Sequence, residues 1–282
     1  MQNKNTPIFI INLKKDIEKK QHMQKLCQKY NLEVEFIEAV YGKELSQEAI
    51  DAIYSEQNSI KEIGRSLSSG ELGCLLSHRT IYQRMISENI PEAIILEDDI
   101  EFNEKFINFL IIKDNLPRDA ELLLLGYWYS GIKYTSALIS FHNRMKISQT
   151  HEIVRFTKKM HGTYAYYITI RGAKKILSSL DNNITMPIDH YTGDENIINL
   201  YGIYPAIVKL SDSFSIDTDL QNERLLLRNK FTSNKIRYDK IKKTLNSFGL
   251  LGLIRVLLLV ILKTKKYLLL FWKQMKILKE YN

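Results

Sequence analysis

The sequence predicts an α/β fold with a mostly parallel central sheet. The first forty residues show a strand, a helix and a strand pattern in turn, and such patterns continue to about residue 220. One of the short apolar runs ends in three consecutive acids. A strand–helix–strand unit normally forms two parallel strands joined by a right-handed crossover. With 282 residues, 45% of them hydrophobic, the chain can bury one large core, and this composition argues against extensive disorder.

The first strand is predicted at residues 8–13, an apolar run between Pro7 and a group of charged residues. A helix is expected at 16–30, where apolar residues recur at helical spacing. A second strand is expected at 32–40, where apolar and polar residues alternate, and Gly42 ends it. Residues 46–63 are polar and helix-prone.

A longer helix is predicted to begin near 68–70 and to end at about 87. Two serines there precede Glu71, and apolar residues then recur at helical spacing. Strands are expected at 93–96, 121–125 and 163–170, followed by a helix at 172–180. The segments 188–191, 193–195 and 204–208 form a stretch that is expected to be rich in loops.

The net charge of +8 is unevenly distributed. From Arg228 to the end there are 14 lysines or arginines and two acids, whereas the preceding residues carry 26 basic and 30 acidic groups. We therefore expect a domain at 1–225 and a basic, amphipathic helical tail at 226–282. A nucleic-acid partner is not expected, because such proteins carry their basic surface on the folded domain.

The tail has the pattern of a helix that lies on a membrane. Its apolar stretch at 248–262 is interrupted by Arg255, and a second apolar patch at 267–272 lies among lysines. A membrane-spanning helix needs about 20 apolar residues with almost no charge. The pattern therefore favours an interfacial helix on an anionic membrane surface. The alternative is that the tail packs on the domain or on a partner subunit.

The two cysteines, Cys27 and Cys74, lie far apart and form no CxxC pair. We expect neither a disulfide framework nor a cysteine zinc site. The N-terminal apolar run is too short for a signal peptide, so the chain is expected to stay in a reducing cytoplasm.

Three acids, Glu97, Asp98 and Asp99, follow the predicted strand at 93–96. Carboxylates at the end of a buried strand repel one another unless a positive charge balances them. Mg²⁺ and Mn²⁺ prefer to be coordinated by oxygen atoms. Proteins with open α/β sheets bind their substrates and cofactors at the carboxyl ends of the strands. The triplet therefore predicts a metal that bridges the phosphates of a nucleotide-sugar. The alternative is a solvated acidic turn.

A second motif starts the helix near residue 70. Gly70 and Gly73 permit close approach of the backbone and leave N–H groups for an anion. Glu71 and His78 are seven residues apart and therefore share one helix face. The alternative for His78 is a half-buried histidine whose hydrogen bonds are satisfied within the protein.

A third cluster, at 187–195, combines acids, a histidine and a tyrosine. Sugar transfer with inversion needs one base to take a proton from the acceptor hydroxyl. Asp189 is the first candidate, and Asp194 and Glu195 are the next. Each can instead cap a helix or stabilise a turn. P-loop, Gly-x-Ser-x-Gly and His-Glu-x-x-His patterns do not occur.

Taken together, these motifs resemble glycosyltransferase family 25, the lipopolysaccharide and lipooligosaccharide biosynthesis transferases of Gram-negative bacteria. The resemblance covers about residues 7–220. It is carried, in order, by Ile8 to Lys14, Ala39 to Gly42, Gly70 to His78, Ile95 to Asp99, Gly162 to Tyr166 with Gly172 to Lys175, and Pro187 to Asp189.

This resemblance implies a GT-A-like nucleotide-sugar-binding domain that transfers a hexose, most often galactose from UDP-galactose, with a β-linkage as the product. Glu71 and His78 are further candidates for donor binding, and Glu97 is a second candidate metal ligand. By the same resemblance, Asn12 and the turn from Ala39 to Gly42 lie near the nucleotide, Glu97 and Asp98 face the ribose or the sugar, and Asp99 binds the metal.

The sequence thus predicts an inverting galactosyltransferase that uses Mn²⁺ or Mg²⁺ and acts on a lipid-linked lipooligosaccharide. We expect it on the inner face of a bacterial inner membrane, as a peripheral protein. Two alternatives remain. The donor is UDP-glucose or a UDP-N-acetylhexosamine, or the chain is a non-catalytic membrane-docking scaffold with a degenerate transferase body.

Overall fold

The computed structural model describes residues 6–128, 139–140, 144–180 and 183–214. These residues belong to a single compact unit. The predicted domain boundary at residue 225 and the predicted helical tail lie outside the described residues and stay predictions. Among the residues that are described, none of the helices combines the length and the apolar character that crossing a membrane requires.

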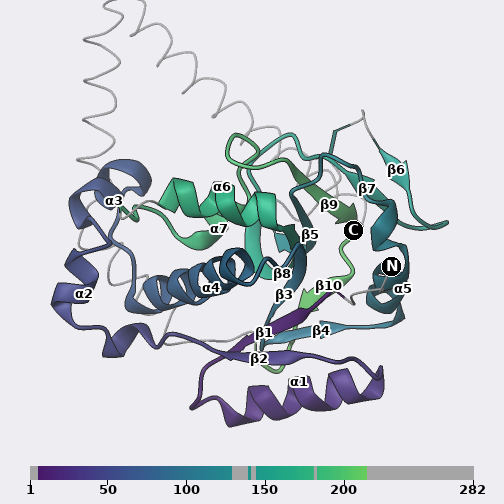
Figure 1. Ribbon diagram of the computed structural model, residues 1–282, viewed down its shortest axis with the longest axis horizontal. Coiled ribbons are helices and arrows are strands. Elements are labelled where there is room, and N and C mark those ends of the chain that lie inside the picture. Colours follow the sequence, from purple (N-terminus) through teal and green to yellow (C-terminus); the bar gives the residue numbers. More distant parts are fainter. Residues whose placement is uncertain (1–5, 129–138, 141–143, 181–182, 215–282) are drawn as a thin grey trace, which may run out of the picture. The chain divides into compact units, whose positions relative to one another are not determined.

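The core of the molecule is an eight-stranded sheet with the order β2-β1-β3-β8-β5-β9-β7-β6 (Figure 1). A separate two-stranded antiparallel sheet pairs β10 (Val208–Leu210) with β4 (Ile100–Phe102). The strands of the large sheet are β1 (Ile8–Asn12), β2 (Glu35–Glu38), β3 (Glu92–Glu97), β5 (Leu122–Trp128), β6 (Met145–Lys146), β7 (Glu152–Val154), β8 (His161–Thr169) and β9 (Leu200–Tyr204).

Most strands of this sheet share one direction. Strand β1 is parallel to β2 and β3, and β5 is parallel to β9, whereas β8 runs antiparallel between β3 and β5. Strand β7 is antiparallel to both of its neighbours. The predicted α/β class with a mostly parallel central sheet is confirmed.

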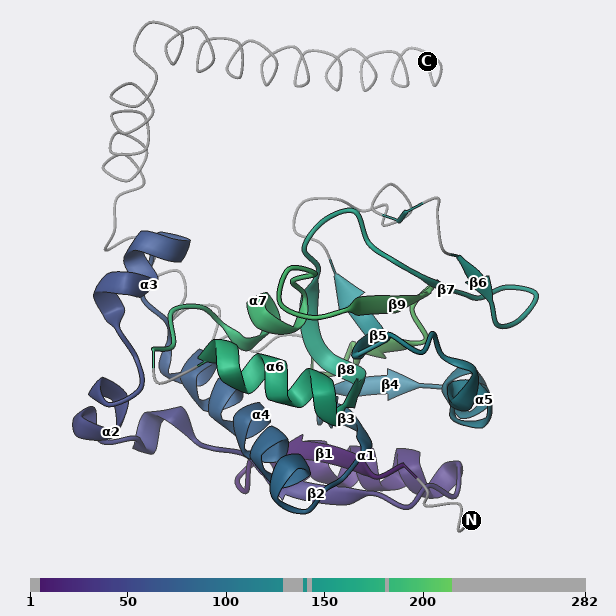
Figure 2. The same ribbon diagram turned by 45° about the horizontal axis from the view of Figure 1, so that its top comes forward.

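Helices cover both faces of the sheet, and β1 shows why. All five of its residues are buried, and alternate side chains join different clusters. Phe9 and Ile11 pack with residues of α4 and α6, whereas Ile8 and Ile10 pack with residues of α1 and α5. Figure 2 shows α4 and α6 lying side by side. The helices are α1 (Ile17–Lys29), α2 (Gln47–Asp51), α3 (Glu56–Ile63), α4 (Ser69–Ser87), α5 (Glu104–Ile112), α6 (Ile170–Leu180) and α7 (Ile188–Thr192), with 3₁₀ turns η1 (Gly42–Glu44) and η2 (Lys113–Asn115).

The helix-prone stretch 46–63 forms two helices, α2 and α3. They are separated at Tyr54, which forms a β-bridge with Ile184 and accepts a hydrogen bond from the Leu67 N–H. One expectation needs correction: the segment 188–191, predicted as part of a loop-rich stretch, belongs to helix α7. One helical turn is too short to show periodicity, and the buried side chains of Ile188 and Tyr191 hold it in place.

Two glycines bring the turn after β2 against helix α4. A Cβ atom on Gly42 would lie 1.8 Å from the carbonyl oxygen of Ser69, and one on Gly73 would lie 2.5 Å from that of Val40. The Val40 N–H also donates to the Ser77 hydroxyl at 2.8 Å. The motif glycines therefore allow a backbone approach that places the turn beside the start of α4.

We predict that Gly73→Ala lowers the free energy of unfolding by about 1–3 kcal/mol, because the new methyl group must displace backbone atoms. Thermal unfolding followed by circular dichroism measures this as a lower Tm. Ser87→Ala, in the last turn of the same helix, should change stability by less than about 0.5 kcal/mol. Equal Tm values for Gly73→Ala and wild type would show that the turn is free to move away.

Candidate functional site

A cleft with a volume of about 870 Å³ lies at the carboxyl ends of β1 and β3. This is the edge at which open α/β sheets bind ligands. Because β8 is antiparallel to β3, the beginning of β8 lies at the same edge, and Thr163 and Tyr164 line the cleft. Eight residues predicted from the sequence also line it: Ala39, Gly42, Glu71, His78, Glu97, Asp98, Asp99 and Asp189.

The acids of the triplet contact different side chains. The Glu97 carboxylate accepts a 3.0 Å hydrogen bond from the Thr163 hydroxyl, and the same oxygen lies 3.6 Å from His78 Nε2. The Asp98 carboxylate accepts a 2.7 Å bond from the Asn12 amide, and its other oxygen lies 3.5 Å from Lys19 Nζ. Glu97 and Asp98 therefore face different sets of groups.

Of the three acids, Asp99 has the fewest hydrogen bonds and ion pairs within the described residues to offset the negative charge of its carboxylate. Its Oδ1 atom is buried and has no hydrogen-bond partner in the described part of the chain, and Oδ2 lies 4.0 Å from Lys19 Nζ. Burial, and then the neighbouring Glu97 carboxylate, raise the pKa of Asp99 to about 7. Burial also raises the pKa of Asp98, although Lys19 and Asn12 oppose this effect. A divalent cation would relieve both effects at Asp99.

The residues present fit a hard divalent cation of the predicted kind. Mg²⁺ is usually bound by one or two carboxylates together with substrate phosphates, so a site that opens on a cleft suits it. Within the described ranges, two groups of side chains lie close enough to share an ion, and neither contains Asp98 or Asp99. Joint ligation of one ion by Glu97 and Asp99 therefore stays a prediction.

We predict that Asp99→Asn stabilises the metal-free protein at pH 8. The folded-state pKa of about 7 exceeds the unfolded value of about 3.9, so the folded chain keeps a proton that the unfolded chain releases. The contribution of Asp99 to stability therefore falls as the pH rises from about 4 to 7. In chelator, the variant should have a higher Tm than wild type at pH 8, and this difference should vanish at pH 4. The same Tm difference at both pH values would contradict the prediction.

Two predicted donor-binding residues are engaged by the protein itself. Asn12 is buried and holds Asp98, as described above, and it does not line the cleft. Glu71 accepts two 2.7 Å bonds from the Arg65 guanidinium and a 2.9 Å bond from the Ser68 N–H. The last of these is half of a capping box that begins α4. Asn12 thus orients an acid at the cleft, and Glu71 anchors one wall of it.

His78 is fully buried, whereas the alternative considered from the sequence was a half-buried and satisfied side chain. Its Nδ1 lies 2.7 Å from the Tyr166 hydroxyl, which lies 2.5 Å from the Tyr82 hydroxyl. Its Nε2 has no hydrogen-bond partner in the described residues and faces Glu97. Tyr166 is 88 residues away along the chain, so no local pattern could reveal this network.

Of the three candidate bases, Asp189 is at the cleft. One of its oxygens lies 3.4 Å from His161 Nδ1. His190 lies beside His161, with a ring-centroid distance of 5.0 Å, and burial lowers the pKa of His190 to about 4. His190 is therefore neutral at pH 7.

Asp194 and Glu195 do not line the cleft. Asp194 pairs with Lys159 at 3.0 Å and accepts bonds from Asn196, and Glu195 is exposed. The structure thus brings Asp189 to the acidic triplet and keeps the other two candidates away from it.

Several residues at the cleft were not identified from the sequence. Lys15, Lys19 and Lys43 line it and give it positive charge beside the acids, and Lys15 lies 4.1 Å from the ring centroid of Tyr41. Trp128 lines the cleft with 46% of its surface exposed. In the sequence, the lysines after the first strand appear only as charged residues. No local pattern indicates that they lie beside the acidic triplet.

An open sheet with a charged cleft at its strand ends defines a ligand-binding α/β protein. The chain belongs to glycosyltransferase family 25: the model of that family, described as "Glycosyltransferase family 25 (LPS biosynthesis protein)", matches residues 5–192. The resemblance expected from the motifs is confirmed.

Several animal proteins have similar sequences. Procollagen galactosyltransferase 1-B of Xenopus laevis is 28% identical over 200 residues, and a glycosyltransferase 25 family member of Drosophila melanogaster is 30% identical over 192 residues. Procollagen galactosyltransferase 2 of Homo sapiens is 25% identical over 201 residues. Each alignment covers 65% of this chain but only 29–30% of the relative.

A solved structure, that of a glycosyltransferase involved in the glycosylation of the major capsid of PBCV-1, matches with a TM-score of 0.31 and 12% identity. The match covers 62% of this chain and 66% of the other.

Proposed function

We propose that this protein transfers galactose from UDP-galactose, with inversion and the help of a divalent cation, to a lipid-linked oligosaccharide of the lipooligosaccharide type. The observation that carries the proposal is the buried Asp99 carboxylate, whose Oδ1 atom has no hydrogen-bond partner among the described residues, at the strand-end cleft of a family 25 chain. The galactosyltransferase names of the relatives support galactose as the sugar.

The charges of the cleft suit a nucleoside diphosphate sugar. Lys15, Lys19 and Lys43 offer positive charge to the diphosphate, while Asp99, with Asp98 beside it, is the group that would hold Mn²⁺ or Mg²⁺. When bound, such a cation supplies positive charge against the diphosphate that leaves. Lys19 lies within 4.0 Å of both Asp98 and Asp99 and holds this pair in place in the free protein.

Asp189 is the proposed general base. In an inverting transfer, the acceptor oxygen forms a bond to C1 of the sugar as the bond from C1 to the diphosphate oxygen breaks. The proton of the acceptor hydroxyl passes to the Asp189 carboxylate. His161, 3.4 Å from this carboxylate, orients it toward the cleft.

The experiment that tests the proposal measures UDP release and product formation with a panel of UDP-sugars, with and without Mn²⁺. The acceptor is a short soluble oligosaccharide or a lipooligosaccharide extract. We expect turnover with UDP-galactose that depends on the metal and the acceptor. If the protein used UDP-glucose or a UDP-N-acetylhexosamine but not UDP-galactose, that sugar nucleotide would be the donor. The absence of both turnover and UDP binding would favour the scaffold alternative.

A membrane surface is the proposed partner of the tail, and the cytoplasmic face of a bacterial inner membrane is the proposed location. The 14 basic residues after position 227 would attract anionic lipid at about 1 kcal/mol each near the surface. We predict that deletion of 245–282 releases the protein from anionic vesicles in a flotation assay and leaves its activity on a soluble acceptor. Loss of folding on deletion would show instead that the tail packs on the domain.

A further inference from the structure

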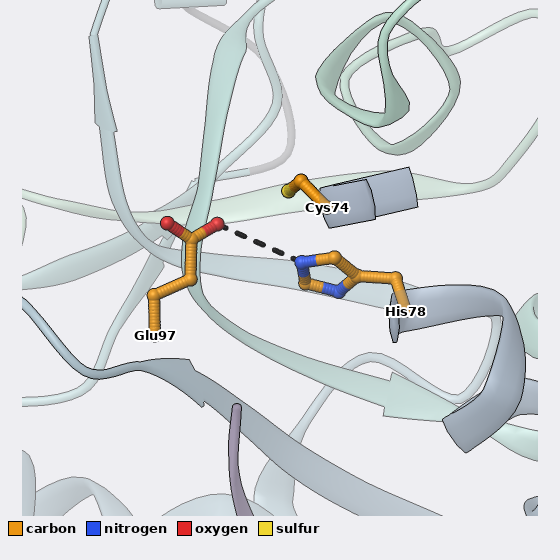
Figure 3. Close-up of side chains that lie close together, drawn as sticks. All are labelled: Cys74, His78 and Glu97. Atoms are coloured by element: carbon orange, nitrogen blue, oxygen red, sulfur yellow. Dashed lines mark ion pairs between the residues drawn. The ribbon is translucent and has the colours of Figure 1, made fainter. Parts of the chain in front are cut away.

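We propose that Cys74, His78 and Glu97 form a binding site for a borderline-soft transition metal such as Zn²⁺, distinct from the hard-cation site at Asp99. Figure 3 shows the three side chains together: Cys74 and His78 project from α4, and Glu97 comes from the end of β3. One ligand atom from each residue lies within 4.8 Å of the other two. All three residues line the cleft.

The distances are close to those that a tetrahedral zinc requires. With ordinary bond lengths to sulfur, nitrogen and oxygen, zinc ligand atoms lie about 3.3–3.6 Å apart. His78 Nε2 and the Glu97 oxygen are already 3.6 Å apart. Cys74, four residues before His78 on the same helix, shares its face, so shifts of about 1 Å complete the geometry.

The environment of His78 is that of a metal ligand. Its Nε2 is fully buried, has no hydrogen-bond partner among the described residues and is directed at Glu97. Its Nδ1 is held at 2.7 Å by the Tyr166 hydroxyl, which in turn contacts Tyr82. A histidine that ligates zinc through one nitrogen commonly donates its other N–H to an oxygen acceptor, which fixes the ring orientation, and the Tyr166 oxygen is placed to accept that bond.

The chemical types of the three ligand atoms favour zinc over Mg²⁺. One sulfur, one imidazole nitrogen and one carboxylate oxygen are ligands that zinc accepts, whereas Mg²⁺ prefers oxygen alone. Binding converts the Cys74 thiol to a thiolate and releases its proton to solvent. Three protein ligands leave a fourth position for water or a substrate oxygen, and all three of these residues line the cleft. Zinc binding itself does not depend on the proposed sugar transfer.

The test uses the full chain, stripped of metal with a chelator and titrated with Co²⁺ and then with Zn²⁺. We expect one equivalent of Co²⁺ to give a thiolate-to-cobalt absorption band that Zn²⁺ abolishes. Cys74→Ser should lose the band, and Cys27→Ser should keep it, because Cys27 is buried in α1 outside the cleft. Tyr166→Phe should weaken zinc binding about 10- to 100-fold, because it removes the partner of Nδ1.

A second measurement uses the unmodified protein, so its result does not depend on whether a variant folds. Zn²⁺ should slow the alkylation of Cys74, mapped by mass spectrometry, whereas Mg²⁺ should not. The proposal is overturned if Co²⁺ binds without a thiolate band, which would point to the group formed by His161, Asp189 and His190. It is also overturned if the band persists in Cys74→Ser or if Zn²⁺ leaves the alkylation rate of Cys74 unchanged.

Discussion

Asp99→Asn is expected to lower kcat/KM for sugar transfer by about a thousandfold, because it removes the carboxylate proposed to hold the divalent cation. A metal that neutralises charge on a leaving group contributes several kcal/mol, and ~4 kcal/mol corresponds to about a thousandfold in rate. The amide keeps the shape of the side chain, so loss of activity reports the charge. UDP release and product formation, measured across a range of Mn²⁺ concentrations, test this.

The matched control is Glu101→Gln. Glu101 lies two residues further on, in β4, where its carboxylate pairs with Lys209 at 3.1 Å and accepts a bond from Ser211. It does not line the cleft, so its variant should keep activity within about twofold of wild type. If Asp99→Asn kept full activity with an unchanged Mn²⁺ requirement, the metal would have to bind elsewhere.

Asp99→Asn also separates function from stability. The substitution is expected to stabilise the metal-free protein at pH 8, because it removes a carboxylate whose pKa is raised to about 7 by burial and by Glu97. A residue that weakens the free protein but supports activity is characteristic of a functional site. An inactive but more stable variant would exclude misfolding as the cause of the lost activity.

Asp189→Asn is expected to lower kcat by about 10²- to 10⁴-fold while leaving UDP affinity unchanged, because a general base contributes about this much to rate. The side chain lies at the cleft and contacts His161, whereas the proposed cation and diphosphate contacts involve other residues. Steady-state kinetics with saturating donor, together with calorimetric titration of UDP, separate these effects.

Asp194→Asn provides the comparison within the same part of the chain. Asp194 pairs with Lys159 and lies outside the cleft, so we expect little change in kcat. If Asp194→Asn were the inactive variant and Asp189→Asn the active one, the base assignment would be reversed. Equal and large losses in both variants, with intact folding, would also count against Asp189 as the single base.

The sequence by itself determined the elements that depend on local signals. Strand β1 is buried at every position and apolar at each except Asn12, as the apolar run predicted. Helix α4 begins and ends where the serines before Glu71 and the helical periodicity predicted. The position of the acidic triplet at the end of β3 also followed from the sequence, since it directly succeeds an apolar run. The ordered motifs were sufficient to indicate the family.

Only the tertiary structure decided which of these acids faces which partner. Glu97 lies with Thr163 and His78, while Asp98 lies with Asn12 and Lys19, and the partners come from separate elements. The antiparallel insertion of β8 places Thr163 at the cleft, and no local pattern encodes strand order. Cys74 lacked a second cysteine nearby, so a cysteine zinc site was not expected, yet folding brings Glu97 to it. Side-chain partners are set by packing between distant segments, and a single sequence reports mainly the interactions of neighbours along the chain.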